Sequence, residues 1–140
     1  MLKARAPLWL AALWWASLSV IGFLVVPMLF ANLPTPAIAG GMAAKLFAAQ
    51  TWLSTICGLT LLALSRQDDD EAAAPLKAAA MPILAGMLLA LLAEFAVAPR
   101  IVARENLALW HGVGSGMYLL QWVCSAVVLW KLTNSAGANR

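Results

Sequence analysis

The chain has 140 residues, of which 64% are hydrophobic and only 11% are charged, and its formal net charge is +3. A mean hydropathy of +0.86 excludes an ordinary soluble domain, and the long apolar runs leave too little polar chain for a separate catalytic domain. The nine Lys and Arg residues lie one or two at a time at the ends of these runs, which is a membrane-topology signal. We therefore expect no nucleic-acid partner.

Four apolar runs are long enough to cross a membrane, which takes about 20 predominantly apolar residues. They span residues 8–31, 40–64, 78–98 and 107–131. We predict an all-α, integral membrane four-helix transmembrane bundle that forms a single domain over residues 1–140. Its surroundings would be the lipid bilayer of a bacterial cytoplasmic (inner) membrane, which the chain would cross as a multi-pass protein.

The first run follows a basic start and exceeds the apolar core of a secretory signal, which has about 7–15 residues. We interpret it as a retained helix that ends before Pro34 and Pro36, because proline resists helix continuation. The second run opens at Gly40.

The segment from Ser65 to Pro75 is the only markedly polar loop that we expect. We interpret its acidic run, Asp68–Glu71, as a solvated connector and not as a metal site. Residues 100–106 form a short link into the fourth helix, and the small, polar tail from Leu132 is expected to be loose.

The positions of Lys and Arg indicate the orientation. Six flank one side of the predicted bundle and three flank the other: Lys3, Arg5, Arg66, Lys77, Lys131 and Arg140 against Lys45, Arg100 and Arg104. Since positive residues are enriched in cytoplasmic segments, we predict that both termini and the acidic loop are cytoplasmic.

Two odd-numbered predicted helices end on the same pattern, F-x-V-x-P. It occurs at Phe23–Pro27 and again at Phe95–Pro99. The match suggests two pseudo-repeated helical hairpins related by an axis along the membrane normal, with a chance match as the alternative.

Glu94 and His111 are the titratable residues set inside apolar runs near the non-cytoplasmic end. At 1.5 Å per residue, each lies roughly 7–8 Å inside that end, so neighbouring antiparallel helices would bring them to one level. Ionisable groups in a membrane interior are costly and often functional. Three interpretations stay open: a proton-handling pair, a half-built metal site and a satisfied buried pair.

Polar side chains also recur along one face of the second and of the fourth helix, at steps of three and four residues. They are Gln50, Ser54 and Cys57 on the second helix, and His111, Ser115, Tyr118, Gln121 or Trp122, and Ser125 on the fourth. We expect these faces, together with the G-x-x-x-G pair Gly112 and Gly116, to meet inside the bundle. Interhelical hydrogen bonds would explain most of this pattern without any ligand.

Three basic residues lie near the level of Glu94. Arg100 and Arg104 would either meet an anionic ligand or lipid headgroup or anchor the helix end at the membrane boundary. Lys45 would either neutralise Glu94 or extend outwards.

Metal and cofactor motifs are absent from the sequence. Cys57 and Cys124 lie inside predicted helices and are expected to be packing residues. The single histidine cannot supply bis-histidine haem ligation. We expect no bound cofactor or metal.

Short matches along nearly the whole chain carry a family resemblance: Gly22-Phe23, Pro27, Leu29-Phe30, Ala39-Gly40, Lys45-Leu46-Phe47, Pro99-Arg100-Ile101, Arg104, Trp110-His111-Gly112 and Ser115. In these the sequence resembles the transmembrane protein 205-like family, whose bacterial members are four-helix membrane proteins of unknown function. The resemblance implies an inner-membrane protein without an assigned reaction. It also implies a distant likeness to copper-resistance-type and protoporphyrinogen-oxidase-type membrane proteins, although this sequence has no histidine in its first helix.

These observations favour a non-enzymatic protein that binds or passes a small solute or ion, with a homo-oligomer giving the room for transport. The expected ligand-binding residues are Glu94, Arg100, Arg104, His111 and, deeper, Tyr118. The alternatives are a structural or assembly subunit without a ligand and a haem- or copper-linked redox protein.

Overall fold

Four antiparallel helical rods make up the computed structural model, which describes residues 2–66 and 70–138. Two rods are interrupted by a π-helical turn, and a short helix joins the second rod to the third. In chain order the elements are α1 (Leu2–Val20), η1 (Ile21–Val25), α2 (Val26–Asn32), α3 (Pro36–Leu64), α4 (Asp70–Ala78), α5 (Ala80–Leu92), η2 (Ala93–Val97), α6 (Ala98–Val102) and α7 (Leu107–Ala138).

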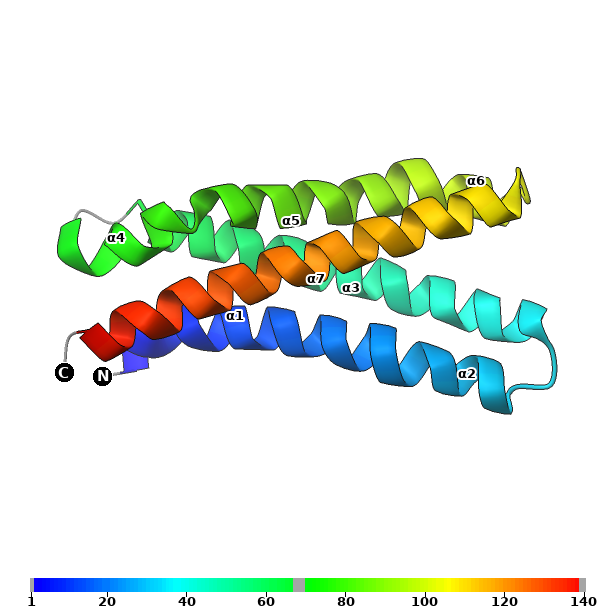
Figure 1. Cartoon of the computed structure of the whole chain (residues 1–140), viewed down its shortest axis with the longest axis horizontal. Helices are drawn as coiled ribbons and strands as arrows, with labels where there is room; N and C mark the ends of the chain where they lie inside the picture. Colours follow the sequence, from blue (N-terminus) through cyan, green and yellow to red (C-terminus); the bar gives the residue numbers. More distant parts are fainter. Residues whose placement is uncertain (1, 67–69, 139–140) are drawn as a thin grey trace.

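Each rod contains a helix that is long and apolar enough to cross a membrane. These spans are Arg5–Asn32, Pro36–Leu64, Ala80–Val102 and Leu107–Ser135. Large apolar side chains such as Trp9, Ile56 and Phe95 are exposed on the outside of the bundle, as expected where lipid is the solvent. The prediction of an all-α, four-helix transmembrane protein is confirmed. Figure 1 shows both termini and α4 at one end of the bundle, and α2 and α6 at the other.

The second rod begins at Pro36, four residues before the expected start. The hydroxyl of Thr35 accepts a hydrogen bond from the backbone N–H of Ile38 at 3.3 Å, which caps the helix. Pro36 occupies the first turn of the helix. Backbone N–H groups in that turn have no hydrogen-bond partner within the helix, so a proline there costs no hydrogen bond. The proline that was expected to separate two helices therefore starts the second one.

Two segments that were expected to be irregular are helical. Residues 70–78 form α4, and α7 continues past Lys131 to Ala138. Alanine-rich sequence favours helix in α4, and Leu76 and Leu132 anchor the two segments because both are buried in the core. Asp68 and Asp69 of the acidic run lie outside the described residues.

The repeated F-x-V-x-P pattern produces the same backbone feature twice. In η1 the N–H of Val26 bonds to the carbonyl of Ile21, and in η2 the N–H of Ala98 bonds to the carbonyl of Ala93. Each is an i→i+5 bond, which defines a π turn. Pro27 and Pro99 follow at the same position and cannot donate to the carbonyl four residues earlier, so a wider turn accommodates each proline ring. The third rod consequently continues past Pro99 to Val102.

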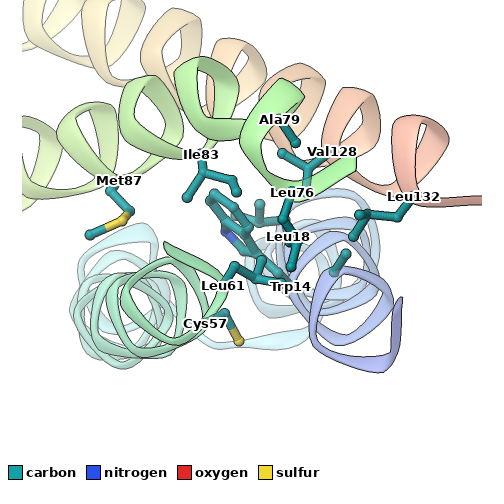
Figure 2. Packing of buried hydrophobic residues seen from close by; sticks show 11 residues of the cluster. Trp14, Leu18, Cys57, Leu61, Leu76, Ala79, Ile83, Met87, Val128 and Leu132 are labelled. Carbon is teal, nitrogen blue, oxygen red and sulfur yellow. The ribbon is translucent and has the colours of Figure 1, made fainter. Parts of the chain in front are cut away.

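The end of the bundle that holds the termini has a solid core. Figure 2 shows Leu18, Leu61 and Ile83 around the indole ring of Trp14, which is completely buried. A Cβ atom added at Gly86 would lie 2.9 Å from that ring. This half of the molecule is therefore closely packed around one tryptophan.

Candidate functional site

The opposite half of the bundle contains a cavity of about 360 Å³. All four rods contribute to its wall. The first supplies Gly22, Phe23 and Val26; the second Gly40, Ala43, Ala44, Phe47, Gln50 and Thr51; the third Ala93, Glu94, Val97, Ala98, Ile101 and Val102; and the fourth His111, Gly114, Ser115, Tyr118, Leu119 and Gln121.

The cavity exists because small residues and π turns occupy positions that large side chains fill at the other end. Ala43, Ala93, Ala98 and Gly114 all lie on its wall, and none of them reaches far from its helix. Both π turns border the space as well. Such turns occur frequently at functional sites.

The floor of the cavity is a hydrogen-bonded network between α1, α3 and α7. Nε2 of Gln50 donates to the hydroxyls of Ser17 at 3.0 Å and of Ser54 at 3.3 Å. The Ser54 hydroxyl in turn donates to Oε1 of Gln121 at 3.4 Å. Both glutamines are at least 96% buried. Within the described residues, Oε1 of Gln50 and Nε2 of Gln121 have no hydrogen-bond partner.

Tyr118 forms one wall, and its hydroxyl is already used. That hydroxyl donates to the carbonyl of Leu18 at 2.8 Å, just before η1. The ring meets the ring of Phe47 edge-on, with centroids 5.2 Å apart, and lies so close to Gly22 that a Cβ there would overlap it. Tyr118 therefore offers the cavity an aromatic surface and joins α7 to the first rod.

A second aromatic group supports η1 from outside the cavity floor. Nε1 of Trp122 donates to the hydroxyl of Ser19 at 2.8 Å, and the ring of Phe23 meets the Trp122 ring edge-on at 5.6 Å. Trp15 lies against the same indole, with centroids 6.0 Å apart. The π turn is thus held in place by contacts with α7.

Glu94 and His111 border the same cavity, as their matching depth suggested. Glu94 is half-buried on η2, whereas His111 is exposed at the start of α7. Both residues are described, and no hydrogen bond or ion pair joins them. The interpretation of Glu94 and His111 as a satisfied buried pair is therefore wrong. The carboxylate and the imidazole both border the cavity, but they form no hydrogen bond with each other.

The basic residues at this end lie away from the cavity wall. The guanidinium of Arg100 lies 4.4 Å from the centroid of the Trp110 ring, a cation–π contact. Arg104 is exposed, in a turn where its φ is 58°. Lys45 is exposed and forms no ion pair with Glu94. Of the five predicted ligand-binding residues, the structure brings Glu94, His111 and Tyr118 together and leaves Arg100 and Arg104 outside.

Most residues of the predicted polar faces of α3 and α7 are buried, whereas His111 and Ser115 are exposed and border the cavity. Gln50, Ser54, Cys57 and Ser125 are buried. Gly112 and Gly116, however, would meet nothing within 4 Å if a Cβ were added. The G-x-x-x-G pair therefore does not pack inside the bundle as expected, since Gly114 is the glycine of this stretch that faces Val97 and Ile101.

Sequence reasoning assigned Gln50 and Gln121 to helix packing and did not propose Phe23 or Phe47 as ligand-binding residues. The available signal for Gln121 was its place on the face that also carries His111 and Tyr118. Both phenylalanines belonged to the short family matches, and Phe23 also opened the F-x-V-x-P pattern, but none of these signals indicated a place on a cavity wall.

Metal-binding groups do not gather in the described part of the chain. No point there brings together three His, Cys, Asp or Glu side chains. Cys57 and Cys124 are both free thiols, in keeping with their interpretation as packing residues.

The comparison with known proteins gives one match. The family model of a domain of unknown function (DUF4149) matches residues 9–109, which include most of the first rod, the whole second and third rods and both π turns. No curated protein and no solved structure matches the chain.

Proposed function

From the premise that the chain belongs to the DUF4149 family, we propose that it binds or passes a small solute or ion through the cavity between its four rods. The observation that supports this most is the cavity itself. It collects Glu94 and His111 with two amide atoms that have no hydrogen-bond partner among the described residues, Oε1 of Gln50 and Nε2 of Gln121, at the end of the bundle that is not filled by packing. A mostly apolar pocket with a few convergent polar groups is the usual form of a ligand site.

The location belongs to the same proposal. The chain would lie in a bacterial inner membrane with both termini in the cytoplasm, so the cavity would be near the non-cytoplasmic side. The finer assignment to the transmembrane protein 205-like family also stays a prediction.

Filling the cavity tests the proposal without knowledge of the ligand. We would compare the thermal unfolding of purified protein in detergent with and without a panel of amines, amino acids, organic acids and inorganic ions. A ligand at 100 times its Kd stabilises the folded state by about 2.7 kcal/mol. Ala43→Leu puts a larger side chain on the cavity wall, whereas Ala49→Leu, on the same helix, is exposed.

We expect at least one compound to raise the Tm of the unchanged protein and of Ala49→Leu but not of Ala43→Leu. If no compound in the panel raises the Tm, the proposal is wrong.

A structural or assembly subunit is the second candidate, and two observations favour it. The network of Ser17, Gln50, Ser54 and Gln121 joins three helices without a ligand, and the face of Gly112 and Gly116 is open. This candidate predicts that Glu94→Gln and His111→Ala change thermal stability and nothing else.

The third interpretation, a haem- or copper-linked redox protein, also stays a prediction. An absorption spectrum and elemental analysis of the purified protein test it, with a Soret band or stoichiometric metal as the supporting result.

A further inference from the structure

The charges around the cavity restrict what it can hold. Glu94 is the only acidic residue among the described residues of the wall, and no Lys or Arg is among them. Lys45, Arg100 and Arg104 are not among the residues that line the cavity, and Arg100 lies over Trp110. A lone carboxylate in a low-dielectric space attracts a cation strongly and repels an anion. An anionic ligand would meet no Lys or Arg on the described wall.

The rest of the wall suits an organic cation better than a metal ion. Phe23, Phe47 and Tyr118 present aromatic surfaces, and cations are attracted to such rings. Small inorganic cations need several oxygen, nitrogen or sulfur ligands to replace their water, and no three metal-binding side chains meet in the described residues. An organic cation carries its own apolar surface and needs fewer polar partners.

The edges of the cavity are also apolar. Phe23, Ala44, Val102 and Leu119 line it and are themselves exposed on the outside of the bundle. Because the outside of a transmembrane bundle faces lipid at this depth, a ligand that partitions into the bilayer can reach the site from the side.

We infer that the cavity binds a monovalent lipophilic organic cation, such as a protonated amine or a quaternary ammonium ion, and that Glu94 is its counter-charge. This inference rests on the proposed function and names the ligand class of that site. Phe47 and Tyr118 would contact its apolar and cationic surface. Oε1 of Gln50, the unpaired acceptor at the floor, would face its positive end.

Three probes of one shape but different charge test this inference. They are benzyltrimethylammonium, its uncharged carbon isostere neopentylbenzene, and the anion phenylmethanesulfonate. Binding of each to the full chain in detergent is measured by calorimetry at matched detergent concentration. We expect the cation to bind at least tenfold more tightly than the neutral isostere and the anion not to bind.

Two variants locate the counter-charge. Glu94→Gln should weaken binding of the cation at least tenfold, which is about 1.4 kcal/mol, and should leave the neutral isostere unchanged. Glu105→Gln removes a carboxylate from an exposed position outside the cavity and should leave all three affinities unchanged. If Glu94→Gln does not fold, the order of the three affinities in the unchanged protein still decides.

The outcomes separate this inference from the proposed function. Binding of the neutral or anionic probe as tightly as the cation would overturn the ligand class and leave a solute site in place. Failure of all three probes, with no stabilising compound in the panel above, would overturn both.

Discussion

Gly22 shows how one missing side chain shapes the cavity. The ring of Tyr118 occupies the place where a Cβ would be, and from there its hydroxyl reaches the carbonyl of Leu18. Any larger residue at position 22 would push the ring away and break that hydrogen bond between α7 and the first rod.

We predict that Gly22→Ala lowers the free energy of unfolding by about 1–3 kcal/mol, as overpacking usually does. Gly40→Ala is the matched control, because a Cβ there meets nothing within 4 Å and alanine favours helix by about 0.5–1 kcal/mol. Thermal or denaturant unfolding in detergent measures both. Equal losses in the two variants would contradict the role given to Gly22.

Ser54 links two glutamines across the bundle, since it accepts from Gln50 and donates to Gln121. Hydrogen bonds between transmembrane helices contribute about 0.6–2 kcal/mol each. We predict that Ser54→Ala lowers the free energy of unfolding by about 1–2 kcal/mol. Thr60→Val should change it far less, because the exposed Thr60 hydroxyl bonds only to the carbonyl of Ile56 in its own helix. A double-mutant cycle of Ser54→Ala with Gln121→Leu measures the coupling, and a coupling near zero would be the contrary result.

At the scale of the element, the π turn in η2 explains how one helical rod can contain Pro99 and also place Glu94 on the cavity wall. A π turn holds one residue more than a regular turn. Removing that residue should restore an α-helix without rotating the segments on either side. Removing a residue from regular helix instead turns everything beyond it by about 100°.

We predict that deletion of Ala96 combined with Pro99→Ala leaves a folded, helical protein. The proline must be replaced too, because proline within a regular helix costs about 3 kcal/mol. Deletion of Leu88, an exposed residue in α5, should prevent folding because it rotates one buried face away from its neighbours. Circular dichroism and size-exclusion chromatography in detergent compare the two. Equal tolerance of both deletions would show that the π turn in η2 is not a separate insertion.

At the scale of the whole molecule, one half is packed and the other is hollow. The half near the termini is filled by Trp14 and the residues around it, as Figure 2 shows. The far half is held together at its floor and walls by hydrogen bonds and aromatic contacts around empty space. The packed half can supply the stability that lets the other half keep a cavity.

We predict from the six-to-three distribution of basic residues that both ends of the chain are cytoplasmic. A fluorescent protein fused after Arg140 should then fluoresce. Alkaline phosphatase fused after Pro34 or Ala103, in the connections at the other end of the bundle, should be active. The reverse pattern of the two reporters would place the cavity on the cytoplasmic side.

The sequence by itself determined the four rods and the common depth of Glu94 and His111. Hydropathy and depth depend only on position along one helix, and a transmembrane helix satisfies its own backbone hydrogen bonds. The pattern F-x-V-x-P was visible too, although its consequence, the π turn, was not.

Only the tertiary structure decided which side chains share the cavity. That depends on how each of the four helices is rotated about its axis, and packing between helices sets this rotation. It directed Gly114 and not Gly112 or Gly116 towards the third rod, and it brought Phe47 to Tyr118. Arg100 was predicted at the site but lies against Trp110 instead. A long, flexible side chain at a helix end contacts the nearest favourable partner. No local sequence pattern reveals which partner that is.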